Sequence, residues 1–213
     1  DKKYIPFIRD NNLTYQEVKL LKAYPKEDIE TIRYFSLNIY LSETIIQIID
    51  KYKIDLRYLK EYISLQSTKD EELIHEYFDY IRIAEELKMN LKDKKILYPN
   101  NLVEEHNKLF LKIKTLNNPN INKKIKAISK ILSLNKYEDE KHIIYPASSI
   151  EDLIKESAEQ HNCVKLYADR VANNESQIYF LRQKDNPNKS YVTVEVYDNK
   201  VIQAKSKYNA NVS

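Results

Sequence analysis

The chain has 213 residues, with 35 Lys and Arg against 32 Asp and Glu, and it contains no glycine and no tryptophan. A formal charge of +3 excludes a strong overall attraction to polyanions, so any such attraction must come from local clusters of basic residues. The lack of glycine excludes the glycine-rich phosphate loops, and the single cysteine excludes an internal disulfide.

The first two-thirds of the chain predicts helices. Thr14 with Glu17 forms a capping-box pattern, Asp55 and Asn100 or Asn101 are candidate N-caps, and the intervening apolar residues follow helical spacing. Thr68 with Glu71 forms a second capping-box pattern. The predicted helices cover residues 14–24, 26–52, 55–65, 68–88, 102–116 and 120–134.

The pattern changes after Tyr137. A cap signature at Ser148 and Glu151 begins a further helix, and the apolar period then switches to two in QIYFLRQ, SYVTVEVYD and KVIQAKSK. We therefore predict an α+β fold that is predominantly α-helical. A helical region covers residues 1–140, and a small module with about three antiparallel strands covers residues 141–213.

The last two strands predict their own register. With a three-residue loop at Asp198–Lys200, Glu195 faces Gln203 and Thr193 faces Lys205, which leaves the other face wholly apolar. A two-residue loop would place Glu195 beside Ile202 and mix polar and apolar residues on both faces. The first register is preferred.

A lysine-rich segment lies between residues 108 and 136, which contain no Asp or Glu. At helical spacing Lys123, Lys126 and Lys130 share one face, opposite Ile121 and Ile125. Such a stripe suits a phosphate backbone, although a solvated helix face has the same pattern. No helix-turn-helix, zinc-finger or RNP signature accompanies it.

Three smaller features are candidates for chemistry. Asn162 as an N-cap would place the Cys163 thiol in the first turn of a helix, with His161 as a base or an imidazolium partner; the alternative is a small buried cysteine. One strand face carries Thr193, Glu195, Gln203 and Lys205, with Arg182 near its edge. These residues either bind an anion together or are simply exposed to solvent. His75 and Asp79 lack a third metal ligand.

The segments HNCVKLYADRV, IYFLR, YVTVEV and VIQAKSKYN resemble the PcfJ-like family, as do FDYIRIAEELKMNL, ILYPNNL and His106 upstream. The resemblance covers most of residues 70–213. It implies a setting on plasmids, phages or other mobile elements, but no particular reaction. The matched polar residues, which the resemblance implies form one site, are His161, Cys163, Tyr167, Arg182, Thr193, Glu195, Gln203 and Asn209.

The chain departs from the family pattern where members usually carry glycine. Ser157 and Lys165 replace two of these glycines, and the segment 205–207 has none. A turn or a close backbone approach of the family is therefore expected to differ here.

Three hypotheses for function follow. The first is a mobile-element accessory protein that binds nucleic acid or a nucleoprotein complex through Lys123, Lys126, Lys130 and the polar strand face. The second is an enzyme acting on nucleic-acid or nucleotide phosphates, with Cys163 or His161 as nucleophile or base, Glu195 as acid or base and Arg182 as anion clamp. The third is a protein-interaction module.

The expected setting follows from the same composition. No apolar stretch is long enough to cross a bilayer, and a lone cysteine suits a reducing compartment. We therefore expect a cytoplasmic protein that does not associate with a membrane. No cofactor and no metal are predicted, and the oligomeric state is left open.

Overall fold

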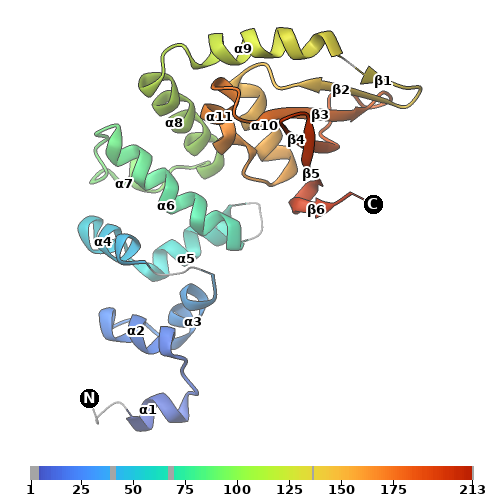
Figure 1. Ribbon diagram of the computed structural model, residues 1–213. Coiled ribbons are helices and arrows are strands. Elements are labelled where there is room, and N and C mark those ends of the chain that lie inside the picture. Colours follow the sequence, from blue (N-terminus) through green and yellow to red (C-terminus); the bar gives the residue numbers. More distant parts are fainter. Residues whose placement is uncertain (1–4, 39–41, 67–69, 136, 213) are drawn as a thin grey trace. The chain divides into compact units, whose positions relative to one another are not determined.

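The computed structural model describes residues 5–38, 42–66, 70–135 and 137–212. The fold is α+β and mainly helical, with an antiparallel sheet in the C-terminal part, as predicted (Figure 1). The chain divides into two compact units, Asp1–Phe110 and Leu111–Ser213. These units are defined by compactness and not as domains, so the domain boundary predicted near residue 140 stays a prediction.

The N-terminal unit is made of helices in the residues that the structure describes. The capping box of Thr14 and Glu17 is present, and the side chain of Asp55 accepts the Tyr58 backbone N–H at 3.0 Å, as predicted. The helices are α1 (Ile5–Asp10), α2 (Tyr15–Ala23), α3 (Ile29–Asn38), α4 (Glu43–Tyr52), α5 (Leu56–Leu65), α6 (Asp70–Glu86), α7 (Lys94–Leu97) and the start of α8 (Leu102–Asn117).

The prediction of one helix over residues 26–52 is wrong. The structure has α3 and α4 instead, because the Ser42 side chain accepts the Ile45 backbone N–H at 3.3 Å and caps a new helix there. The apolar stripe continues across both helices, so periodicity alone could not show the break. The predicted cap at Thr68 lies outside the described residues.

Tyrosine rings form much of the N-terminal core. The ring of Tyr77 has no exposed surface and stacks on that of Tyr98, with centroids 6.0 Å apart. The hydroxyls of buried Tyr62 and Tyr80 donate to the carbonyls of Pro99 and Ile96, at 2.7 and 2.6 Å. The rings of Tyr62 and Tyr80 therefore pack in the core while their hydroxyls are satisfied by the backbone.

The C-terminal unit combines helices with a sheet. The strands lie in the sequential order β1 to β6, and each neighbouring pair is antiparallel. The helices are the end of α8, α9 (Ile121–Leu132), α10 (Ile150–Gln160) and α11 (Ala168–Ala172), with 3-10 turns η2 (Ser133–Asn135), η3 (Val164–Tyr167) and η4 (Lys207–Asn209). The strands are β1 (Tyr137–Glu138), β2 (His142–Pro146), β3 (Gln177–Gln183), β4 (Val192–Tyr197), β5 (Lys200–Ser206) and β6 (Ala210–Asn211).

Three of these strands were predicted, and β1, β2 and β6 were not. β1 and β6 have two residues each, too few for a period-two pattern to be visible. A cap prediction also shifts by one residue: Ser149, not Ser148, accepts the Asp152 backbone N–H and begins α10. The Ser148 hydroxyl instead donates to the Asp152 carboxylate at 2.6 Å.

The polar face of the sheet is the face that the helices cover. Glu195 lies opposite Ile178 on β3 and Gln203 on β5, so these side chains share one face with Thr193. Glu156 of α10 accepts a hydrogen bond from the Thr193 hydroxyl at 2.6 Å. Consequently Thr193 and Glu195 are buried, and the interpretation of this face as solvated is wrong.

The β4–β5 hairpin combines both registers considered above. Glu195 pairs with Gln203, as the three-residue loop predicted, yet Tyr197 pairs with Lys200 across a two-residue turn. Asp198 and Asn199 form that turn with φ of 50° and 58°. A bulge at exposed Ile202 reconciles the two registers.

Candidate functional site: a polar cavity on the covered sheet face

A cavity of about 270 Å³ lies within the C-terminal unit. Strands β3, β4 and β5 contribute to its lining, together with the α10–η3 connection and η4. The lining residues are Asn162, Cys163, Val164, Tyr167, Ile178, Thr193, Glu195, Gln203, Lys205 and Asn209. This polar cavity thus brings together residues that lie up to about fifty positions apart in the chain.

The register of the sheet places the Glu195 carboxylate in the polar cavity. Glu195 is 5% exposed, and its Oε1 accepts the Ser176 hydroxyl at 2.8 Å while Oε2 accepts the Gln203 amide N–H at 2.7 Å. Arg170 of α11 lies 3.4 Å from Oε1. A buried carboxylate with this many donors is both charge-compensated and held in one orientation.

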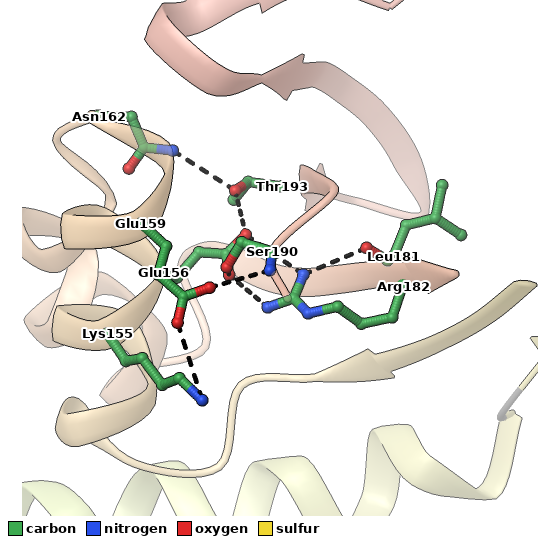
Figure 2. A network of polar contacts seen from close by, with 8 residues as sticks. All are labelled: Lys155, Glu156, Glu159, Asn162, Leu181, Arg182, Ser190 and Thr193. Atoms are coloured by element: carbon green, nitrogen blue, oxygen red, sulfur yellow. Dashed lines mark hydrogen bonds and ion pairs between the residues drawn. The ribbon is translucent and has the colours of Figure 1, made fainter. Parts of the chain in front are cut away.

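Behind Thr193 lies a second buried carboxylate, that of Glu156 (Figure 2). Its side chain is 0% exposed and forms an ion pair with both terminal nitrogens of Arg182. The Ser190 hydroxyl donates to the same carboxylate at 2.6 Å, and Asn162 donates to Thr193 Oγ1 at 3.4 Å. We call these five residues the Glu156 network.

The Glu156 network changes the assignment of Arg182. The guanidinium is buried, binds Glu156 and lies over the ring of Phe180 at 5.0 Å. It does not line the polar cavity. Arg182 therefore holds α10 against the sheet, and the structure does not support its predicted role as an anion clamp.

A neighbouring carboxyl fastens the loop before β4 to α10. Burial by itself raises the pKa of Glu159, but hydrogen bonds from the backbone N–H and the side chain of Ser190, with Lys155 and Arg182 nearby, outweigh it and leave the pKa below its usual value. The Ser190 N–H donates to Glu159 Oε2 at 2.9 Å. Ser190 thus binds two carboxylates of α10 and positions the start of β4.

The Cys163 thiol is exposed and lines the polar cavity. Asn162 Oδ1 accepts the Val164 backbone N–H at 3.0 Å, but the N-cap of the four-residue η3 is Cys163, without a side-chain cap hydrogen bond, so the prediction of Asn162 as the N-cap of a helix is wrong. The Ser157 hydroxyl donates to the Asn162 carbonyl. The alternative of a buried cysteine is wrong.

His161 lies beside the cavity rather than in its lining. It ends α10 in the left-handed region, with φ of 50°, and its ring stacks on that of Tyr208 with centroids 4.7 Å apart. Tyr208 and Asn209 also have positive φ, 60° and 56°. A tyrosine in this region is uncommon and strained, so the packing around η4 holds it there.

The predicted lysine face is present on α9. Lys123, Lys126 and Lys130 are exposed, whereas Ile121 and Ile125 are fully buried. In the part of the chain that the structure describes, these three lysines, which we call the α9 lysine row, form no ion pair. Lys136, at the end of the same basic segment, lies outside the described residues.

The described residues hold neither a candidate metal-binding group nor a candidate membrane span. They contain no group of three or more His, Cys, Asp and Glu side chains placed to hold a metal ion. Within the same ranges no helix combines the length and the apolar character that a membrane span requires.

The structure brings together most of the predicted site residues. Cys163, Tyr167, Thr193, Glu195, Gln203 and Asn209 line the polar cavity, whereas His161, Arg182 and the α9 lysine row do not. Sequence reasoning missed Glu156 and Ser176, which hold Thr193 and Glu195. A signal existed for Glu156, an acidic residue on the buried face of an amphipathic helix beside Leu153 and Ser157.

Fold and cavity together define an α+β protein with a polar site on the covered face of an antiparallel sheet. A family model described as PcfJ-like protein matches residues 76–213. The chain therefore belongs to the PcfJ-like family, and the match contains all residues of the polar cavity. No curated protein and no solved structure matches this chain.

Proposed function

We propose that this protein binds nucleic acid, alone or in a nucleoprotein complex, as an accessory factor of a plasmid or phage. The α9 lysine row carries the proposal. Its three ammonium groups lie on one exposed helix face and form no ion pair among the described residues, in a chain whose net charge is only +3. The mobile-element setting is what the family resemblance implies.

The physical argument concerns where the charge lies. Lysines paired with carboxylates release few counterions on binding a polyanion, and Lys108 and Lys114 are paired in this way with Glu105 and Asp169. The α9 lysine row has no such compensation among the described residues. Its spacing on one face of a single helix lets it follow consecutive phosphates.

The proposal is tested by fluorescence anisotropy with labelled single-stranded and duplex DNA and RNA at several salt concentrations. Lys123→Glu, Lys126→Glu and Lys130→Glu are combined in one variant. We expect at least about tenfold weaker binding and a shallower salt dependence, by about 2–3 in the slope of log K against log salt.

A matched control places the same charge change elsewhere. Lys19, Lys22 and Lys26 are exposed, and Lys22 lies in the last turn of α2 as Lys130 does in α9. The corresponding triple Glu variant should weaken binding much less. Equal losses in the two variants, or no binding by the unaltered protein, would contradict the proposal and leave a protein-interaction module.

A second candidate function is an enzyme acting on nucleic-acid or nucleotide phosphates. The observation that favours it is that the exposed Cys163 thiol and the Glu195 carboxylate line one cavity. Cleaved or modified oligonucleotide, abolished by Cys163→Ala or Glu195→Gln, would support it. Binding without any product would reject it.

A further inference from the structure

We propose that the polar cavity binds one unpaired nucleobase that carries an exocyclic amino group, as part of a nucleotide or of a single strand. This inference deepens the proposed function, because it names what the C-terminal unit recognises beyond the phosphate backbone. It depends on the size of the cavity, the hydrogen-bonding groups in its lining and the balance of charge there.

The size suits a single ring system. Small-molecule pockets usually enclose about 300–1,000 Å³, and this cavity has about 270 Å³. A dinucleotide or a peptide segment would not fit inside it. One base fits, provided that its sugar and phosphate remain at the mouth.

The acceptors in the lining suit an amino group. Gln203 must turn its NH₂ toward the Glu195 carboxylate, which directs its carbonyl oxygen away from Glu195. A carboxylate has about four lone-pair sites; the Ser176 hydroxyl and the Gln203 amide use two of them, and Arg170 lies 3.4 Å from Oε1 as an ion pair. The remaining acceptor capacity matches the exocyclic amino group of adenine, cytosine or guanine, which uracil and thymine lack.

The charge of the lining favours a base over a phosphate inside the cavity. Among the described lining residues Glu195 and Lys205 carry the formal charges, which cancel, and Arg170, outside the lining, is already paired with Glu195. The Lys205 ammonium donates to Asn211 Oδ1 at 2.6 Å, which holds it toward β6. A phosphate beside the Glu195 carboxylate would be repelled, whereas a neutral heterocycle would not.

Apolar and aromatic groups complete the fit. Val164, Ile178 and Tyr167 line the same cavity and offer surface to the faces of a flat ring. The stacked His161 and Tyr208 rings flank it, next to the lining residues Asn162 and Asn209. Strained backbone at Tyr208 and Asn209 is the kind of feature that clusters at ligand sites.

The single cysteine supplies a direct readout. Cys163 is exposed and lines the cavity, so a bound base should slow its modification by a maleimide, followed by mass spectrometry of the intact protein. The probes are the 5′-monophosphates of adenosine, cytidine and uridine, and single-stranded tetranucleotides of each base. We expect protection by the adenosine and cytidine probes and at least about tenfold weaker protection by the uridine probes.

Variants locate the effect in the cavity. Gln203→Leu removes the amide at similar volume, and Asn209→Gly removes a side chain while keeping a residue that tolerates positive φ. In both variants the nucleotide probes should protect Cys163 at least about tenfold more weakly. Asn199→Gly is the matched control, because Asn199 has the same left-handed backbone in the hairpin turn outside the cavity.

The outcomes separate this inference from the proposed function. Protection by monophosphates shows that the base alone is recognised, and protection by tetranucleotides only shows that a strand is needed; either supports the inference. No protection by any probe overturns it, as does equal protection by uridine, even where the α9 lysine row binds polyanions. Protection without any polyanion binding by the α9 lysine row overturns the proposed function and leaves the inference standing.

Discussion

In Asp1–Phe110 the buried side chains are almost all apolar or tyrosine, whereas Leu111–Ser213 buries two carboxylates, a guanidinium and several hydroxyls. The buried polar residues of the C-terminal unit are Ser129, Glu156, Ser157, Gln160, Ser176, Arg182, Thr193 and Glu195; those described in the N-terminal unit are Glu17, Thr31 and His106. Buried charges rarely add stability over apolar residues of the same size. Within the polar set of the C-terminal unit, Thr193 and Glu195 line the polar cavity, whereas Glu156 and Arg182 join α10 to the sheet.

The largest effect is expected where a buried charge loses its partner. Glu156→Gln keeps the shape of the side chain but removes the carboxylate that pairs with the buried Arg182 guanidinium. Breaking a buried pair costs about 3–5 kcal/mol, so the C-terminal unit should unfold at much lower urea concentration. Circular dichroism in urea measures this change, with the exposed Glu140→Gln as control. A loss below about 1 kcal/mol would mean that the pair is not buried in solution.

An apolar core responds through packing alone. Leu59 of α5 has no exposed surface, and Leu59→Ala should destabilise the N-terminal unit by about 2–5 kcal/mol. The polar cavity lies in the other unit, so protection of Cys163 by nucleotides should remain. Hydrogen exchange followed by mass spectrometry separates the two units. Equal loss of protection across both units would show that they unfold together.

The two units also show which features the sequence could predict. Caps at Thr14 and Asp55 and the Glu195–Gln203 register depend on residues close in the chain, so local rules found them. The pairing of Glu156 with Arg182 joins residues far apart, and only packing of α10 on the sheet brings them together. Alternation showed which strand residues share a face, but not which face the helices cover.

Alkaline pH should weaken the N-terminal unit first. Burial raises the pKa of Tyr80 and Tyr98 to about 12 and raises those of Tyr62 and Tyr77 as well. Unfolded tyrosine titrates near pH 10, so this stability is fully present below pH ~10 and is lost as pH rises toward ~12. Tyrosine absorbance and circular dichroism follow the transition together. In Tyr77→Phe the decline should be shallower, and an unchanged profile would contradict the argument.

The smallest effect concerns the bulge that sets the polar face. Deleting Ile202, which is 55% exposed, should leave a regular two-residue hairpin in which Glu195 still faces Gln203. We expect a change in stability below about 1 kcal/mol and unaltered protection of Cys163 by nucleotides. Deleting Ala204 instead would move Lys205 to the other face of the sheet. Gln203 and the β5 residues after it would then no longer alternate as they do now. Equal loss of protection in both variants would show that the register does not position the cavity. Loss of protection in the Ala204 deletion alone would show that the bulge only accommodates the turn and that β4 positions the site.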